Sequence, residues 1–416
     1  MQDRPPAPSA DPRQDAGRPV GATLTGLLLI GVLVGTTNGL SRVALPLFAT
    51  SLGAQPWQVG LVGGLGYTGL LLLALPMGLW MERHGSRALF GFGVAVAAAM
   101  FALALPAVAA WGGVGLLVAV AAMQGLALPF RVVPVHAEFL LLMPRLAPAQ
   151  AGWNRAASML GMFFTGPTLA ALLIGALGYA WAFRIAGALL VVAWAMGRHA
   201  LEPAHPAAAA LPGGWGALMA RTRHSAAVLR DDADLRRTMA IDFLTQMAVG
   251  YFAVFVLVLA MRVFHLPVQA AAGLVTLQGV VFVALLLAGG HWLSRWPQGW
   301  TYLGACVCLL LQAVLLGWAW APWVLWLGAA LLGVGLAVQG ITSVNRMAVA
   351  LQRHGRGRVG GLISLGPPAG GVLGTLVGGV LSQHWGPQSG FQVLAVGFGV
   401  LCWFQWRHAL AASAVY

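Results

Sequence analysis

The chain has 416 residues, of which 59% are hydrophobic and only 8% are charged, and its mean hydropathy is +0.83. Soluble globular proteins carry about 25% charged residues, so this composition excludes a soluble domain with a polar surface. The formal net charge of +13 comes from arginine alone, because the sequence has no lysine. Such basicity can indicate nucleic-acid binding, and the placement of the arginines decides whether it does.

Apolar runs recur from one end of the chain to the other, and runs of 18 or more residues are typical of membrane-spanning helices. Extending the shorter runs to spanning length, and dividing the longest one at Gly178, predicts twelve transmembrane helices. The runs cover residues 27–40, 61–80, 88–110, 114–128, 166–196, 239–260, 270–289, 302–318, 323–337, 370–381 and 393–404.

The arginines outside these runs fall almost entirely on one side of the membrane when the N-terminus is placed in the cytoplasm. Only Arg184 and Arg262 lie near the other side. Cytoplasmic loops are enriched in Lys and Arg, so the pattern predicts a multi-pass protein of a bacterial-type inner membrane with both termini cytoplasmic. The charge is explained by topology, and no nucleic-acid partner is predicted.

The order of segments predicts two halves. Residues 1–20 are Pro-rich and of mixed charge, which predicts a disordered cytoplasmic tail. Residues 21–198 form the first predicted six-helix bundle, residues 199–237 a polar cytoplasmic central loop, and residues 238–410 the second bundle.

The two halves share weak internal similarity. The stretch "GLWMERHGSRALF" at Gly78 has a counterpart, "GHWLSRWPQGWTY", at Gly290. Gly166-Pro167 likewise has a counterpart in Gly366-Pro367, and both pairs are expected at hinge or packing positions. Two similar six-helix halves are typical of secondary transporters, which bind substrate near the midplane between the repeats.

The segment between the second and third predicted helices carries a family motif. It reads Gly78-Leu-Trp-Met-Glu82-Arg83-His-Gly85-Ser-Arg87, against Gly-x-Leu-x-Asp-Arg-x-Gly-Arg-Lys/Arg in the major facilitator superfamily. The chain resembles that superfamily over about residues 20–410. The resemblance implies an all-α polytopic membrane protein with twelve transmembrane helices in two pseudo-symmetric six-helix bundles. It also implies that Gly78, Glu82, Arg83, Gly85 and Arg87 form a cytoplasmic conformational latch.

Two further motifs of the superfamily are incomplete. Gly166-Pro167 in the fifth span resembles an antiporter motif and favours export, although Leu169 and Ala170 stand where paired glycines are usual. Gln124-Gly125 in the fourth span matches the end of an Arg-x-x-Gln-Gly motif, but Ala121 occupies the arginine position. The arginine that supports proton coupling in drug–proton antiporters is therefore replaced.

Ionisable side chains inside spans are candidates for function, since each costs about 2.5 kcal/mol or more at the bilayer centre. Arg42 lies in the first span, Arg131, His136 and Glu138 lie in the fourth, and Asp242 lies at the start of the seventh. The resemblance implies that spans 1, 4, 7 and 10 line the substrate cavity. The polar side chains on these spans that could complete a substrate site are Asn38, Thr245, Gln246, Gln339, Thr342 and Asn345.

Helical spacing separates these groups. Arg131 and Glu138 are seven residues apart, so they share a helix face about 10 Å apart along the axis. His136 points elsewhere unless Pro134 kinks the helix. We expect Arg42 and Arg131 in the cavity, and Glu138, Asp242 and His136 in coupling or gating. Purely structural roles are the alternative. In these, Arg131 pairs with a carbonyl or carboxylate group, and the side chain of Arg42 extends to the membrane–water interface.

Two arginines within spans, against two carboxylates near the span ends, favour an anionic substrate. The sequence predicts a monomeric secondary transporter that moves a small organic solute by alternating access. Coupling to protons is expected, and export is the favoured direction. The alternatives are import of a small organic anion, transition-metal transport through Met261-x3-His265, and a non-transporting scaffold. The sequence shows no nucleotide-binding loop, metal-ligand cluster or nucleophile–base motif, so no enzyme activity, cofactor or resident metal is predicted.

Overall fold

The computed structural model describes residues 20–146, 150, 153–203, 230, 232–293, 298–354 and 356–413. The expected tail, apart from Val20, and most of the expected central loop lie outside these residues. The described elements are helices: α1 (Val20–Ser51), α2 (Pro56–Ala99), η1 (Met100–Ala104), α3 (Leu105–Trp111), α4 (Val114–Leu142), η2 (Met143–Arg145), α5 (Trp153–Leu160), η4 (Gly161–Thr165), α6 (Gly166–Leu177), α7 (Tyr179–Ala200), α9 (Ala233–Val258), η5 (Leu259–Val263), α10 (Val268–Leu293), α11 (Gln298–Gly317), α12 (Pro322–His354), α13 (Arg356–Trp385) and α14 (Ser389–Ser413).

Within the described residues, 11 helical stretches are long and apolar enough to cross a membrane. The twelfth span is the first part of α2, because this helix breaks at Gly85, where φ is 75° and ψ is 156°. This left-handed conformation favours glycine, which has no Cβ. The expected all-α architecture is confirmed in the part of the chain that the structure describes, and the first part of α2 accounts for the twelfth expected span.

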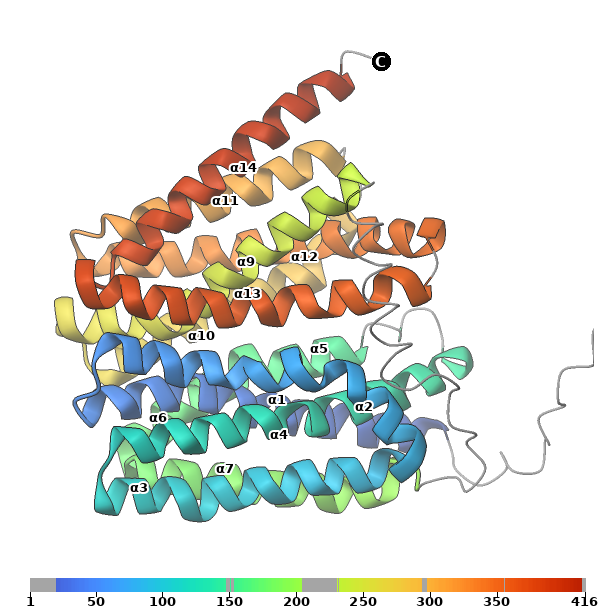
Figure 1. The fold of residues 1–416 in the computed structure, drawn as a ribbon, viewed down its shortest axis with the longest axis vertical. Coiled ribbons are helices and arrows are strands. Elements are labelled where there is room, and N and C mark those ends of the chain that lie inside the picture. Colours follow the sequence, from blue (N-terminus) through green and yellow to red (C-terminus); the bar gives the residue numbers. More distant parts are fainter. Residues whose placement is uncertain are drawn as a thin grey trace, which may run out of the picture.

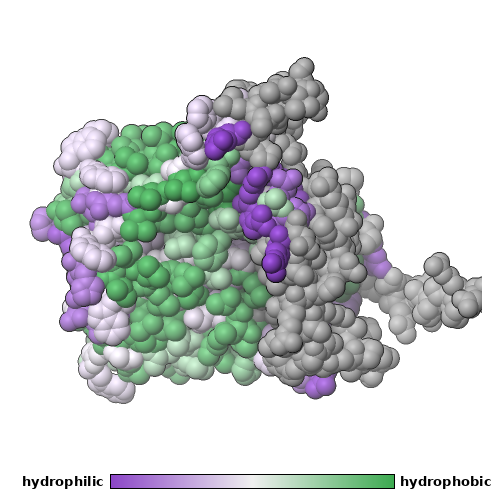
Figure 2. Space-filling view, turned by 45° about the horizontal axis from the view of Figure 1, so that its top comes forward, coloured by the Kyte–Doolittle hydropathy of each residue, from purple (hydrophilic) through white to green (hydrophobic). Residues whose placement is uncertain are grey.

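The spans form two groups that follow the order of the chain. Helices α1 to α7 lie together on one side of the molecule and α9 to α14 on the other (Figure 1). A broad hydrophobic band covers the face shown in Figure 2, with hydrophilic residues toward its ends. Lipid tails cannot hydrogen-bond, so helices that satisfy their own backbone and expose apolar side chains are stable there.

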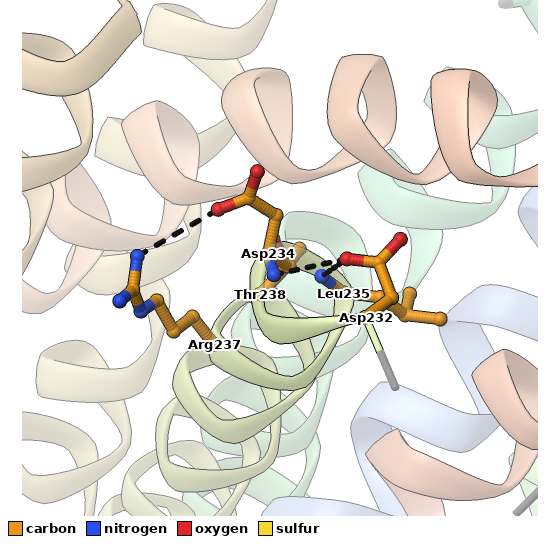
Figure 3. Close-up of polar contacts among 5 residues, drawn as sticks. All are labelled: Asp232, Asp234, Leu235, Arg237 and Thr238. Atoms are coloured by element: carbon orange, nitrogen blue, oxygen red, sulfur yellow. Dashed lines mark hydrogen bonds and ion pairs between the residues drawn. The ribbon is translucent and has the colours of Figure 1, made fainter. Parts of the chain in front are cut away.

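Local signals explain where the second group begins. The Asp232 carboxylate accepts hydrogen bonds from the backbone N–H groups of Asp234 and Leu235, both at 3.0 Å, and so caps α9 (Figure 3). Arg237 lies 3.7 Å from Asp234 in an exposed ion pair that contributes little to stability. Helix α7 continues to Ala200 and α9 starts at Ala233, so helices occupy both ends of the segment expected as the central loop.

The two groups touch most closely through glycines. A Cβ added at Gly60 on α2 would lie 2.5 Å from the backbone oxygen of Thr375 and 2.8 Å from Cα of Gly379 on α13. On α13, a Cβ at Gly379 would lie 3.1 Å from Cα of Trp57 and 3.2 Å from Cα of Gly60, both on α2. Small residues let transmembrane helices approach this closely. The two halves are therefore in backbone contact along α13.

Candidate functional site

A cavity of about 220 Å³ lies between the two halves. Its walls come from α1, α2 and α4 of the first half, Met162 of η4, and α9 of the second half. Most of the lining is apolar. The polar or ionisable side chains that line it are Asn38, Ser41, Arg42, Tyr67, Gln124 and Arg131, and no carboxylate is found among the lining residues that the structure describes.

Arg131 on α4 is the most deeply buried cation of the cavity, with an exposed fraction of 3%. Its Nε and Nη1 atoms have no hydrogen-bond partner among the described residues. A buried charge without partners is costly, and a guanidinium group is shaped to bind a carboxylate or phosphate through two parallel hydrogen bonds. Arg131 therefore presents unused donors next to the cavity.

Arg42 on α1 connects the two halves beside the same cavity. One of its terminal nitrogens, Nη2, donates a hydrogen bond of 2.9 Å to the backbone oxygen of Val249 on α9. The guanidinium group also lies 5.5 Å from the ring centre of Phe163 and 6.0 Å from that of Tyr67, at distances typical of cation–π contacts. Its Nε has no partner among the described residues. Arg42 thus has one contact across the interface and one unused donor.

Glu138 lies on α4 but outside this cavity. Its Oε1 atom accepts hydrogen bonds from the Ser86 hydroxyl and, at 3.2 Å, from the backbone N–H of Glu202. Neighbouring Arg87 donates from Nε and Nη2 to the backbone oxygen of Leu201, at 3.0 and 2.8 Å. Glu138 therefore joins α4 to the turn within α2 and to the end of α7. These contacts belong to one half and do not involve Arg131.

Only some of the residues expected to form the latch take part in this network. Arg87 contributes directly, and Gly85 makes the turn that places Ser86. Arg83 is exposed, and a Cβ at Gly78 would meet nothing within 4 Å. The side chain of Glu82 lies outside what the structure describes.

Asp242 also lies outside the cavity, well inside α9. Its Oδ1 accepts a hydrogen bond of 2.7 Å from Nε2 of Gln339 on α12, and both side chains are buried. Nearby, Thr342 donates to the backbone oxygens of Val338 and Gln339 on its own helix. Asp242 is therefore part of a polar contact within the second half.

The other expected site residues are dispersed. Thr245 is buried, and its hydroxyl has no partner among the described residues. Thr245, Gln246, Gln339 and Thr342 are absent from the described cavity lining, and the Asn345 side chain lies outside the described residues. Asn38 does line the cavity together with Arg42 and Arg131.

His136 faces away from both Arg131 and Glu138. The residue is exposed, and its Nδ1 lies 3.3 Å from Nδ2 of Asn154 on α5. The same helix α4 therefore sends Arg131 to the cavity, Glu138 to the turn within α2, and His136 toward α5.

The expected hinge and packing pairs have different neighbours. A Cβ at Gly166 would lie 2.5 Å from the backbone oxygen of Thr36 and 2.8 Å from Cα of Gly39, so Gly166-Pro167 starts α6 in close contact with α1. At Gly366 the nearest atom is Cε of Met239, at 3.6 Å, and Pro367 lies inside α13.

A sequence profile of the Major Facilitator Superfamily matches residues 27–365 and 238–414. The chain belongs to the Major Facilitator Superfamily. It is a multi-pass membrane protein and a transporter of small molecules, as the family and the apolar helices indicate.

Solved structures of the same superfamily share the fold. The nucleoside transporter NupG has a TM-score of 0.70 at 14% identity, covering 94% of this chain and 99% of that chain. An aspartate-to-alanine mutant of NupG has a TM-score of 0.71 at 15% identity, covering 92% of this chain and 99% of that chain. At such identities the likeness shows the fold alone. No curated protein matches the sequence.

Sequence reasoning did not select Tyr67 or Gln124 as site residues. Both line the cavity, Tyr67 from the first part of α2 and Gln124 from α4. Gln124 had a usable signal, because a polar amide inside a span needs a partner. Tyr67 had none, since tyrosine is common in membrane helices and its span was not expected to line the cavity.

Proposed function

We propose that this superfamily member transports a small organic solute that bears an anionic group, by alternating access through the cavity beside Arg131. The observation that supports this proposal is the buried Arg131 guanidinium group with unused donors in a cavity whose described lining has no carboxylate. Arg42 adds a second positive charge beside the same space. An anionic group on the solute would offset part of this positive charge, which a neutral or cationic solute does not.

Alternating access requires that the cavity close at one end at a time. The two halves are in contact at the end of the molecule opposite the start of α1 and the end of α14. There Arg262 donates from Nη2 to the backbone oxygen of Ala54 at 2.9 Å, and Gly60 packs against Thr375 and Gly379. With the termini in the cytoplasm of a bacterial-type inner membrane, as we propose, this conformation is closed toward the outside. We also propose that one chain is the transport unit, since both halves of the cavity come from it.

Export is the proposed direction. An interior-negative membrane potential drives a monoanion outward by about 2.3 kcal/mol per 100 mV, so export of an anion is favoured without another ion. The close contact of Gly166 with α1, in the segment that resembles the antiporter motif, supports the same direction. Proton coupling is the second part of the proposal, with Asp242 as the candidate proton carrier because it is a buried carboxylate within a span.

Import of a small organic anion is the second candidate function. It is favoured by the positive charge of the cavity, and it requires cotransported protons to overcome the membrane potential. Proteoliposomes with separately imposed pH and potential gradients distinguish the two directions. Outward movement of anions driven by potential alone supports export, whereas accumulation that requires an inward proton gradient supports import.

The role of Arg131 is tested with Arg131→Met and Arg131→Lys. The probes are labelled short-chain and aromatic carboxylates, organic cations and nucleosides, in binding and vesicle assays. We expect the native protein to bind carboxylates, and Arg131→Met to weaken that binding about 10- to 100-fold, as for a lost hydrogen bond to a charged group. Lysine should restore only part of it, because it lacks the planar fork.

Arg184→Met is the matched control, because Arg184 lies on α7 against the ring of Trp181 and does not line the cavity. Unchanged carboxylate binding in a folded Arg131→Met protein would remove Arg131 from the site. Selective binding of cations or nucleosides by the native protein would contradict the anion proposal.

A further inference from the structure

Gln124 brings a hydrogen-bond acceptor to the cavity lining, whereas the two arginines bring hydrogen-bond donors. Its side chain is buried, with an exposed fraction of 5%, and it lines the cavity from α4. Its Nε2 donates a hydrogen bond of 3.1 Å to the backbone oxygen of Ala97 on α2. This bond fixes the amide orientation, since the reversed amide would set two oxygens against each other. The remaining atom, Oε1, has no hydrogen-bond partner among the described residues.

An unpartnered amide is not by itself a sign of a ligand. Gln278 and Gln312 also have unpartnered buried amide atoms, but neither lines the cavity. Gln124 differs because it lines the same cavity as Arg131 and Arg42, whose side chains carry donors without a partner among the described residues. The unsatisfied atoms of this cavity therefore form a complementary set of several donors and one acceptor.

The helix geometry keeps these groups within reach of one small molecule. Gln124 and Arg131 are seven residues apart, so they lie on the same face of α4, about 10 Å apart along the axis. Helical side chains lean toward the N-terminus, so the long Arg131 side chain extends toward Gln124. Leu128, one turn from each, lines the cavity between them. A solute that contacts both residues has to bridge the gap that remains between these polar ends.

Resting on the proposed function, we propose that the solute is a small hydroxy-carboxylate. Its carboxylate accepts hydrogen bonds from Arg131, and its hydroxyl donates a hydrogen bond to Oε1 of Gln124. A neutral hydroxyl matches this site better than an ammonium group, because the described lining offers two guanidinium groups and no carboxylate to pair with a cation. Apolar side chains such as Val132 and Val254 contact the carbon skeleton.

Gln124 is then the residue that determines specificity for the hydroxyl group. An acid of the same skeleton without the hydroxyl leaves the buried Oε1 unsatisfied in the complex, which costs binding. Ser41, which also lines the cavity, donates its hydroxyl proton to the backbone oxygen of Thr37 at 2.9 Å. Recognition of the hydroxyl is assigned to Gln124 because its Oε1 is a buried acceptor of the lining without a partner among the described residues.

The test uses pairs of acids that differ by one hydroxyl: lactate and propionate, 3-hydroxybutyrate and butyrate, mandelate and phenylacetate. Binding and transport are measured with the full-length protein in proteoliposomes. We expect the native protein to prefer the hydroxylated member of at least one pair by about tenfold or more. Gln124→Met should abolish that preference by weakening the hydroxylated acid while the deoxy acid binds as before.

Gln312→Met is the matched control, because Gln312 is fully buried on α11 and lies away from the cavity, and it should retain the native preference. Equal binding within every pair by the native protein, or a preference that survives in Gln124→Met, overturns the hydroxy-carboxylate assignment and leaves the anion proposal standing. If the native protein binds none of the carboxylates, both fall. Should Gln124→Met not fold, Gln124→Asn shortens the same amide by one methylene, and an unreduced preference there overturns the assignment.

Discussion

Alanine at Gly60 should open the end of the molecule at which the two halves meet. The added Cβ would lie 2.5 Å from the backbone oxygen of Thr375, whereas ordinary contacts begin at 3.4 Å. The obstructing atoms at Thr375 and Gly379 belong to the backbone, so no side chain can rotate away. Helices α2 and α13 must separate by about 1 Å, and overpacking of this kind costs about 1–3 kcal/mol.

That cost applies only to the conformation in which α2 and α13 touch. If the opposite conformation separates these helices, its population relative to the closed form rises by the same free energy. Because about 1.4 kcal/mol corresponds to a tenfold change, the ratio should shift about 5- to 150-fold. A protein that is mostly closed at this end would then populate both conformations measurably.

The assay is a distance measurement between spin labels at Ser51 and Gln383, which are exposed at this end on opposite halves. The three native cysteines, Cys306, Cys308 and Cys402, are first replaced. We expect Gly60→Ala to add a population at longer distance. Gly304→Ala on α11, where a Cβ meets nothing within 4 Å, should leave the distribution unchanged. An unaltered distribution in a folded Gly60→Ala protein would refute the reasoning.

Two further predictions concern the buried carboxylates. Glu138→Ala removes the acceptor of the Ser86 hydroxyl and of the Glu202 N–H, so we expect it to lower the free energy of unfolding in detergent by about 1–3 kcal/mol. The control is Glu202→Ala, whose side chain is exposed and whose removal should change nothing. Equal melting temperatures for the two variants would contradict the structural role of Glu138. Asp242→Asn keeps an oxygen that can accept from Gln339 but cannot carry a proton. The fold should therefore persist, while stimulation of transport by a pH gradient is lost. Stimulation equal to that of the native protein would exclude Asp242 as the proton carrier.

The sequence alone determined the architecture, because a membrane imposes few solutions. Each span must be helical and apolar over a fixed length, and the loops must carry their arginines on one side. The break at Gly85 and the close approach of Gly166 to α1 occur at positions that the sequence motifs had indicated. The cost of charge in lipid likewise directed attention to Arg42, Arg131, Glu138 and Asp242.

Only the tertiary structure decided which of these groups share a site. Helical spacing shows that Arg131 and Glu138 lie on one face of α4, but the neighbours along that face change with depth. Arg131 meets the cavity, while Glu138 meets Ser86 and the end of α7. The position of Arg42 next to the same cavity depends on how α1 packs against α4 and α9, which no local sequence pattern encodes.

The free acceptor of Gln124 is a further property that depends on tertiary contacts. The sequence shows only that an amide lies in a span. Its nitrogen donates to the backbone oxygen of Ala97, and its oxygen is left without a partner among the described residues, because of how α2 packs against α4. The membrane environment and the hydrophobic pattern of the sequence determine which segments form helices. The chemistry of the cavity depends on which of these helices become neighbours.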